Sequence, residues 1–233
     1  LAQAYALPEN LSELPIKRYG FHGLSYEYIA QVLPQLEPKR AEGKIIVAHL
    51  GQGASLCALK QRKSVATTMG FTPLEGLPMG TRCGSLDPGI ILYLLAEKNY
   101  SISELRDLLY KKSGLCGVSG ISGDVQELLK AETETAKLAI DLFIYRIVRE
   151  TGSLAAALGG LEGLVFTGGI GEHAGFVRAQ VCQQLAWLGV DLDLVKNKHN
   201  AVTISTKQSA LPVLVIPTNE EVILAQQTWA SIS

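Results

Sequence analysis

One arginine stands in a loop that could present it to an anion. Arg82 lies within TPLEGLPMGTRCGSLDP (72–88), a stretch with two prolines before the arginine and glycines on both sides of it. Proline and glycine at this density predict an ordered loop rather than a helix or a strand. A guanidinium group offers a planar fork of donors that fits carboxylate or phosphate, and it stays charged at any workable pH. The stretch alone is equally compatible with a surface turn that carries a solvated arginine.

Two histidines are candidates for polar catalytic roles, although a structural role is the more common one for a single histidine. His22 lies in a glycine-flanked loop just before a predicted helix with Ser25 as its N-cap residue. Anions are favoured at such a helix N-terminus. His49 lies near the end of the apolar run 44–50, which is typical of a buried strand.

Three glycine-rich segments recur along the chain, namely 51–53, 113–124 and 168–171. A tight turn explains any one of them, but together they predict a nucleotide pocket in which backbone N–H groups meet phosphates. The sequence has no G-x-x-x-x-G-K-[ST] motif, which excludes a P-loop protein. GGIGEH (168–173) lacks the third glycine of the dinucleotide-binding pattern.

The elements around these residues predict an α/β domain with a mixed sheet. The first two strands should form a hairpin with Gly51-Gln52-Gly53 at its tip, and the third should follow directly. A long helix at about 132–158 should be largely buried through a wide apolar surface that includes Leu138 and Tyr145. The expected strands are 44–50, 54–59, 62–68, 164–167 and 211–216, and the other expected helices follow Ser25 or span 89–97, 104–111, 124–129, 175–188 and 220–229.

Composition narrows the class of protein. The chain has 233 residues, 47% of them hydrophobic, which is enough to bury a sizeable core. A net charge of -1, from 21 basic and 22 acidic residues, gives no electrostatic footprint for nucleic acid. We find no run of apolar residues long enough to cross a membrane and no signal peptide at the start, so we expect a cytoplasmic protein. The four cysteines lack metal-binding spacing and predict reduced thiols.

Six blocks in order resemble the acetate/propionate kinase family over essentially the whole chain. They are RYGFHG (18–23), HLGQGASL (49–56), MGFTPLEGLPMGTRCG (69–84), LDPG (86–89), FTGGIGE (166–172) and PTNEE (217–221). The resemblance implies a ribonuclease-H-like domain of the acetate and sugar kinase, Hsp70 and actin superfamily. It also implies reversible transfer of the ATP γ-phosphoryl group to acetate or propionate, giving an acyl phosphate and ADP.

The same resemblance implies roles for individual residues. His22 and Arg82 would stabilise the transferred phosphoryl group, and Glu220 would hold Mg²⁺, or Mn²⁺ in its place. Residues from three segments would contact ATP or ADP: His49, Leu50, Gly51, Gln52, Gly53, Asp124, Val125, Gln126, Gly169, Ile170, Gly171, Glu172 and His173.

The chain departs from the family pattern in composition and in length. Gln52 stands where asparagine is usual, and Leu24 and Tyr26 replace polar residues after His22, which puts a secondary polar contact in doubt. Family members carry an N-terminal domain before the point that matches Leu1. We therefore expect a C-terminal nucleotide-binding domain (1–219), a closing helix (220–233) that would pack on the absent domain, and little turnover from this chain alone.

Two further expectations concern assembly and an alternative function. The resemblance implies a homodimer. The alternative function, from a different class, is a non-catalytic nucleotide-binding or assembly module of the actin-like superfamily.

Overall fold

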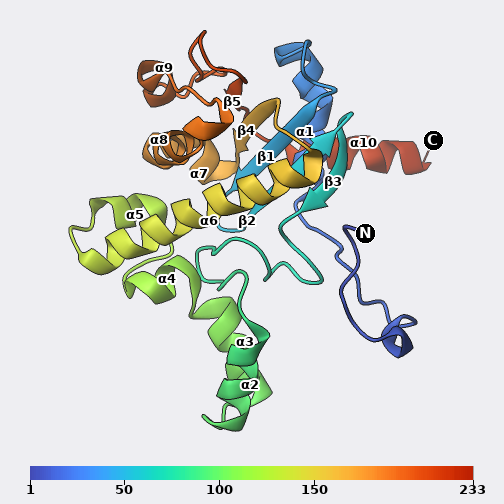
Figure 1. Cartoon of the computed structure of the whole chain (residues 1–233), viewed down its shortest axis with the longest axis vertical. Helices are drawn as coiled ribbons and strands as arrows, with labels where there is room; N and C mark the ends of the chain where they lie inside the picture. Colours follow the sequence, from blue (N-terminus) through green and yellow to red (C-terminus); the bar gives the residue numbers. More distant parts are fainter. Residues whose placement is uncertain (233) are drawn as a thin grey trace.

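The computed structural model describes residues 1–232, which form an α/β domain around one mixed sheet (Figure 1). The strands are β1 (Lys44–Leu50), β2 (Ala54–Lys60), β3 (Lys63–Thr67), β4 (Gly163–Thr167) and β5 (Val213–Val215). The helices are α1 (Gly23–Leu36), α2 (Pro88–Ala96), α3 (Ile102–Lys111), α4 (Gly114–Ser119), α5 (Val125–Lys130), α6 (Glu134–Leu158), α7 (Gly168–His173), α8 (Gly175–Gln184), α9 (Leu194–Lys198) and α10 (Glu220–Ile232), with short 3₁₀ turns η1 (Glu9–Leu11) and η2 (Ala186–Leu188).

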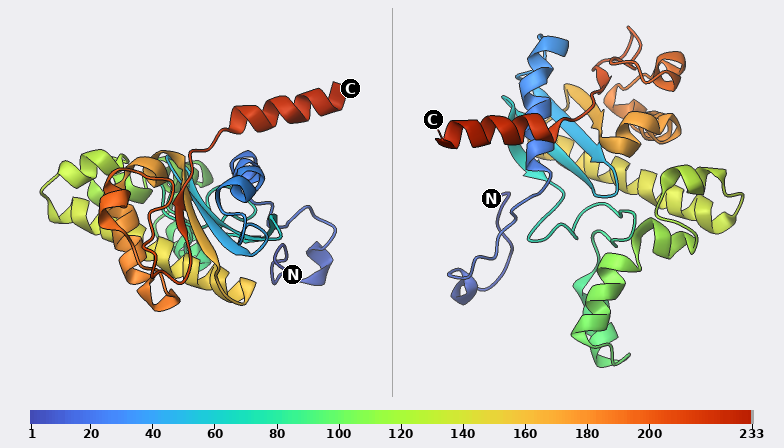
Figure 2. Two further views of the ribbon diagram at one scale, coloured as in Figure 1. Left: turned by 90° about the horizontal axis from the view of Figure 1, so that it is seen from above. Right: turned by 180° about the vertical axis from the view of Figure 1, so that it is seen from behind.

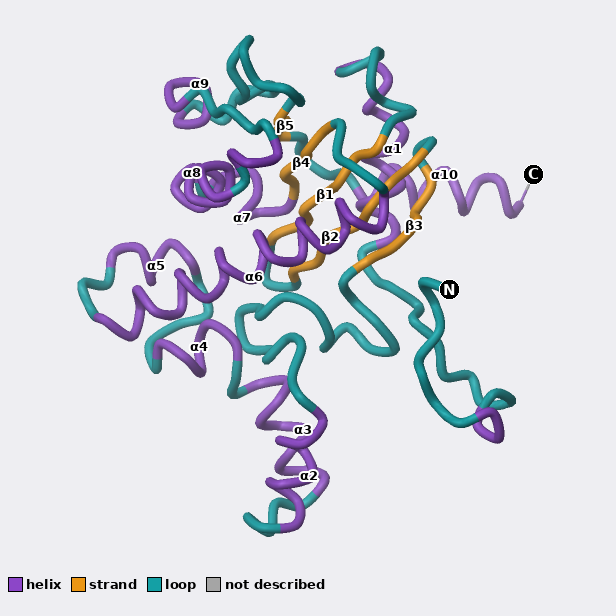
Figure 3. The backbone as a smooth tube through the Cα atoms, in the orientation of Figure 1, coloured by secondary structure: helices purple, strands orange, loops and turns teal. Residues whose placement is uncertain are grey.

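The strand order β3-β2-β1-β4-β5 combines an antiparallel half with a parallel half. β1, β2 and β3 pair antiparallel, whereas β1, β4 and β5 run parallel. Because the parallel strands point the same way, the chain leaves β1, β4 and β5 at one edge of the sheet (Figure 3). That edge carries the segments 51–53, 168–173 and 217–220, and it is where ligands bind in open α/β sheets.

Alternation along β1 divides the core between the two faces of the sheet. Ile46, Ala48 and Leu50 belong to the larger cluster of buried side chains, which includes the inner face of α6. Ile45 and Val47 belong to a second cluster, which includes the inner face of α1. The view along the sheet in Figure 2 shows α1 and α6 on opposite sides. His49 follows the odd-numbered pattern and therefore lies on the α1 side.

The long helix α6 confirms the expected element, but two of its apolar residues face solvent. Phe143, Ile144 and Ile147 are buried against the sheet. Leu138 and Tyr145 are 58% and 56% exposed, so the expected apolar surface was too wide. Both residues lie away from the stripe that faces β1, β2 and β3, because a helix on one face of a sheet buries only one side.

Glycine-rich segments are more helical than the sequence predicted. Residues 114–119 form α4, and the expected turn after β4 is the short helix α7, which begins directly at Gly168. Gly114 and Gly168 have φ of 62° and 77°, a conformation that favours glycine. These residues therefore turn the chain sharply into each helix rather than ending regular structure.

The start of α1 also differs from the prediction. His22, with φ of 60°, is the N-cap residue, and Ser25 lies inside the first turn as a fully buried residue. Its hydroxyl bonds to another side chain instead of capping the helix. Ser25 as the N-cap residue was therefore wrong.

Two segments extend away from the sheet. α2 and α3 form an arm that projects below the sheet in Figure 1, and α10 extends from the domain beyond α1. No helix within residues 1–232 is both long and apolar enough to cross a membrane. The four cysteines are free thiols, as predicted, and burial raises the pKa of Cys57 to about 11 and that of Cys182 to about 12.

Candidate active site

The two candidate histidines form a stacked pair between α1 and the β1–β2 hairpin. Their ring centroids are 4.2 Å apart with an interplanar angle of 23°. His22 Nδ1 lies 2.8 Å from Ser55 Oγ, and His49 Nδ1 lies 2.8 Å from Ser25 Oγ. Both serines are fully buried, so each ring is fixed from its inner side.

Burial makes both imidazoles hard to protonate. Desolvation lowers the pKa of His49 to about 4. Desolvation also lowers the pKa of His22 to about 4, with further contributions from the nearby His49 and the Arg82 guanidinium. The pair is therefore neutral at physiological pH, and it can supply N–H donors or nitrogen acceptors but not positive charge.

Arg82 supplies the positive charge beside this pair. Its Nη1 donates to the Pro73 carbonyl oxygen at 3.2 Å and lies 3.6 Å from Met79 Sδ, so the loop holds its own arginine. The side chain has no ion pair within residues 1–232. A Cβ placed on Gly53 would lie 2.9 Å from His22 Nε2 and 3.8 Å from Arg82 Nη1, so both groups face the tip of the hairpin.

The three glycine-rich segments meet in one pocket of about 250 Å³ next to this tip. The pocket lies between the β1–β2 hairpin, the N-terminus of α5 and α7. Asp124 is the N-cap residue of α5, and its Oδ1 accepts a hydrogen bond from Gln126 N at 2.6 Å. The lining residues are Gly51, Gln52, Gly123, Asp124, Val125, Gln126, Gly169, Ile170 and His173.

The remaining residues expected to contact nucleotide lie outside that pocket. His49 belongs to the histidine pair, and Gly53 lies beside His22 and Arg82. Leu50 is fully buried in the core, and Gly171 is a buried residue of α7 itself. Glu172 Oε1 accepts hydrogen bonds from Gly168 N and Thr218 N at 3.0 and 3.3 Å, so this carboxylate joins α7 to the turn before α10.

Two departures from the family pattern can be placed. The side chain of Gln52 lies against Gly80 of the loop 72–88 that carries Arg82 (the arginine loop). A Cβ on Gly80 would come within 2.4 Å of Gln52 Oε1. Gly80 N also donates to the Gln52 carbonyl oxygen at 3.4 Å, so the hairpin tip and the arginine loop are in direct contact. The hydroxyl of Tyr26 hydrogen-bonds to Ser55 Oγ, which in turn contacts His22 Nδ1, so Tyr26 reaches His22 through this serine.

Two threonines lie at the carboxyl ends of parallel strands: Thr167 ends β4, and Thr218 follows β5 shortly before Glu220. The hydroxyls of Thr167 and Thr218 are buried and have no hydrogen-bond partner in the described part of the chain. Glu220 begins α10 two residues after Thr218 and is partly exposed. Oxygen atoms of this kind, hydroxyl and carboxylate, are the ligands that a hard cation prefers. Residues 1–232 contain no cluster of three or more His, Cys, Asp or Glu side chains, so a closed metal site of the zinc type does not fit.

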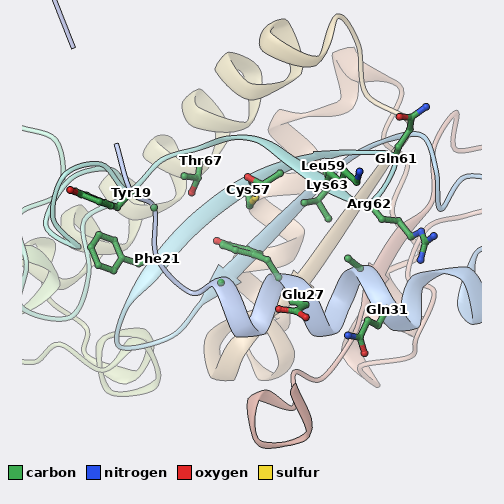
Figure 4. A pocket seen from close by; sticks show the side chains of 15 residues that line it. Tyr19, Phe21, Glu27, Gln31, Cys57, Leu59, Gln61, Arg62, Lys63 and Thr67 are labelled. Carbon is green, nitrogen blue, oxygen red and sulfur yellow. Dashed lines mark hydrogen bonds between the residues drawn. The ribbon is translucent and has the colours of Figure 1, made fainter. Parts of the chain in front are cut away.

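A larger cavity, of about 560 Å³, lies elsewhere, between α1 and the β2–β3 hairpin. Figure 4 shows it extending from Tyr19 and Phe21 at one end to Gln61 and Arg62 at the other. His22, His49 and Arg82 do not line it. We therefore assign the candidate site to the smaller pocket, which lies beside the hairpin tip that His22 and Arg82 face.

A buried arginine that was not expected from the sequence supports the pocket. Arg178 is fully buried, and its Nη1 donates to the carbonyl oxygens of Gly171 and Glu172, both at 2.8 Å. Its other nitrogens bond to Asn197 and Asn200. Arg178 therefore fixes the C-terminal end of α7 against α9, and no local sequence signal marks it.

The sheet order and the grouping of loops at the carboxyl ends of its parallel strands define a ribonuclease-H-like domain of the acetate and sugar kinase, Hsp70 and actin superfamily. The sequence matches the Acetokinase family over residues 1–226. The chain belongs to that family.

Relatives support this membership in sequence and in structure. The acetate kinase of Rhodopseudomonas palustris (strain TIE-1) is 56% identical over 232 residues, 98% of this chain and 58% of the relative. That of Rickettsia akari (strain Hartford) is 46% identical over 227 residues, 97% of this chain and 59% of the relative.

The crystal structure of Porphyromonas gingivalis acetate kinase superposes with a TM-score of 0.94 at 37% identity, over 100% of this chain and 60% of that one. A propionate kinase from Francisella tularensis gives 0.91 at 38% identity, over 97% of this chain and 59% of that one. The chain thus spans about 58% of the length of the curated relative that it matches in R. palustris.

Proposed function

We propose that this chain is the nucleotide-binding part of a short-chain carboxylate kinase, which transfers the ATP γ-phosphoryl group reversibly to acetate or propionate. One observation carries the proposal: three glycine-rich segments line one pocket, with His22 and Arg82 at the hairpin tip beside it. The names of the relatives, acetate kinases and a propionate kinase, support the choice of acceptor. Because ATP is the donor, the proposed compartment is the cytoplasm.

The residues divide the work in a way that suits phosphoryl transfer, which depends on positioning and on stabilising charge. Backbone N–H groups at Gln52 and Gly169 would bind the phosphates of ATP or ADP. The Arg82 guanidinium offsets the charge on the transferred group, and His22 and His49 supply neutral polar contacts beside it. Asp124, Gln126 and His173 line the remainder of the pocket for the nucleoside.

A magnesium ion would be held by Glu220, and the hydroxyls of Thr167 and Thr218 are further candidate ligands. Mg²⁺ takes one or two carboxylates together with water and phosphate oxygens, which agrees with a single partly exposed glutamate at the start of α10. When bound, such an ion lowers the charge on the phosphates. Manganese shares this preference for oxygen ligands and is the second metal that we propose.

The domain division is part of the proposal. We infer that residues 1–219 form one nucleotide-binding domain and that the helix from 220 packs on the portion of the relatives that this chain does not match. The outer face of α10 supports this inference, since Val222 and Leu224 are exposed and only Ile223 is buried within the described helix. The carboxylate pocket would then depend on both portions, and this chain alone would turn over little substrate.

We also propose that the kinase is a homodimer that pairs through the arm formed by α2 and α3. α2 reads PGIILYLLA and buries none of its residues within the domain. Leu92 and Tyr93 are 66% and 50% exposed on a helix that stands away from the sheet (Figure 1). A continuous apolar surface of this kind marks a protein interface in a monomer that is otherwise well packed.

Binding of ADP tests the pocket directly. A Cβ on Gly169 would meet no atom within 4 Å, so Gly169→Leu should fill the pocket without disturbing the fold. Calorimetric titration with ADP should show saturable binding to the wild-type chain and at least a tenfold loss in Gly169→Leu. The matched control is Gly152→Ala on α6, which is remote from the pocket and should bind like wild type. Equal affinity in all three proteins would contradict the assignment.

The second candidate, a non-catalytic nucleotide-binding module, also predicts ADP binding. It gives no reason for an arginine that makes no ion pair within residues 1–232 and lies beside two neutral histidines. Phosphoryl transfer to acetate separates the two, because only the kinase forms an acyl phosphate.

A further inference from the structure

The inner nitrogen of each candidate histidine bonds to a buried serine hydroxyl. Ser55 Oγ lies 2.8 Å from His22 Nδ1, and Ser25 Oγ lies 2.8 Å from His49 Nδ1. In a neutral imidazole one nitrogen donates and the other accepts, so the direction of these two hydrogen bonds decides which nitrogen faces outward with a proton.

The direction of the hydrogen bond between His22 and Ser55 follows from the number of protons that need an acceptor. The Tyr26 hydroxyl is buried, and Ser55 Oγ is its one hydrogen-bond partner in the described chain. Burial also raises the pKa of this phenol well above its ordinary value, so it keeps its proton. Tyr26 must then donate a hydrogen bond to Ser55 Oγ, and the Ser55 hydroxyl must donate its own hydrogen bond to His22 Nδ1. The reverse order would leave the phenol proton buried without an acceptor, which is costly.

The same argument fixes the direction of the hydrogen bond between His49 and Ser25. Ser25 is fully buried, and His49 Nδ1 is the only partner of its hydroxyl within residues 1–232. If His49 Nδ1 carried the proton, the Ser25 hydroxyl would have no acceptor. Ser25 therefore donates, and the His49 proton is on Nε2.

Both outer nitrogens face the hairpin tip. His22 Nε2 would lie 2.9 Å from a Cβ on Gly53, and His49 Nε2 would lie 3.9 Å from a Cβ on Gly51. The register of the sheet holds this arrangement, because His49 pairs with Ser55 across β1 and β2 and both side chains point to the α1 face. Two N–H bonds and the Arg82 guanidinium thus converge on the tip.

We propose that Tyr26, Ser55 and Ser25 are positioning residues that hold His22 and His49 as neutral Nε2–H tautomers, with both N–H groups directed at the hairpin tip. Resting on the proposed function, the inference assigns these two N–H groups to oxygens of the transferred phosphoryl group. Arg82 then provides charge, while the histidines provide directed donors that need no protonation. Preorganised donors of this kind are effective because they need not reorient during the reaction.

The test is the tautomeric state of each ring in the ligand-free chain, read from two-bond ¹H–¹⁵N correlations at neutral pH. Both histidines should be Nε2–H in the wild-type chain. Tyr26→Phe removes the phenol that donates to Ser55 but keeps the aromatic ring. Ser55→Ala removes the hydroxyl that donates to His22 Nδ1. Each variant should lower the ratio of the Nε2–H to the Nδ1–H tautomer of His22 by roughly fivefold, which corresponds to the loss of about one hydrogen bond. The tautomer ratio of His49 should not change in either variant. In Ser25→Ala the ratio of His49 should fall, and that of His22 should stay the same.

A wild-type His22 with its proton on Nδ1 would overturn the proposal, as would an unchanged His22 ratio in both Tyr26→Phe and Ser55→Ala. The unaffected histidine in each spectrum reports whether the variant is folded. Since no nucleotide is present, this measurement can fail while ADP still binds. Conversely, absence of ADP binding would refute the proposed function, but it would not affect the tautomer measurement, which is made without nucleotide.

Discussion

The imidazole rings of His22 and His49 stack 4.2 Å apart, although His22 precedes a helix and His49 lies near the end of a strand. The contact depends on α1 covering the face of β1 to which His49 points. It also requires His22 to take a left-handed conformation, with φ of 60°, as the N-cap residue of α1. One backbone turn and one strand alternation therefore bring together two groups that lie far apart in the sequence.

This pair predicts a loss of stability in mild acid. Unfolded histidines titrate near pH 6.5, whereas both rings have a pKa of about 4 in the folded chain. Between these values the unfolded state binds more protons, so the free energy of unfolding should fall as pH falls, by up to roughly 1.4 kcal/mol per pH unit for each histidine. Urea unfolding at pH 7 and pH 5 measures this change. The double variant His22→Gln, His49→Gln should show a shallower dependence, and an unaltered slope would mean that the two buried rings are not its cause.

The glycines at the two ends of α4 predict different costs for the same substitution. Gly114 and Gly120 both have positive φ, of 62° and 66°. A Cβ on Gly114 would lie 2.1 Å from the Met79 carbonyl oxygen, whereas one on Gly120 would meet nothing within 4 Å. Gly120→Ala should therefore cost about 1 kcal/mol from its conformation alone, and Gly114→Ala should cost clearly more. Chemical denaturation of both variants provides the comparison, and equal costs would argue against close packing of the arginine loop.

The buried Arg178 predicts a large effect at a residue outside the pocket. Arg178→Met would leave the carbonyl oxygens of Gly171 and Glu172 without their donor. The free energy of unfolding should fall by ~3 kcal/mol, since buried polar groups would lose their partners. Arg149→Met on the exposed part of α6 is the control and should change stability by less than about 0.5 kcal/mol. A similar small change in Arg178→Met would mean that α7 does not depend on this residue.

The arm formed by α2 and α3 predicts the oligomeric state. Leu92→Glu places a charge on the exposed face of α2 and should convert a dimer into a monomer by light scattering, with little effect on folding. Leu194→Glu changes an equally exposed leucine on α9, at 68% against 66%, and should leave the dimer intact. A wild-type chain that is monomeric at high concentration would contradict the assignment of this surface.

Elements with clear periodicity were predictable from the sequence. The β1–β2 hairpin and α6 were expected close to their observed bounds, because apolar alternation, a glycine tip and a helical stripe are local signals. The short helices α4 and α7 were not expected, since glycine lowers helix propensity and the packing that forms them is not local.

The sequence singled out His22 and Arg82 as candidates, but it did not indicate the residues that contact the two histidines. Ser55 and Tyr26 meet through strand pairing and helix packing, which no single motif encodes. A signal was nevertheless present: a hairpin centred on Gln52 pairs residue 49 with residue 55, which places Ser55 beside His49. Arg178 offered no such signal, because its partners come from α7 and α9.

The central claim is that this chain supplies the nucleotide side of a carboxylate kinase. We would replace the matching 232 residues of the R. palustris acetate kinase with this chain and measure acyl phosphate formation from ATP and acetate. We expect activity within about tenfold of that relative, reduced by at least roughly a hundredfold in Arg82→Gln with ADP affinity retained. A folded chimera that binds ADP but forms no acyl phosphate would contradict the claim and favour the non-catalytic module.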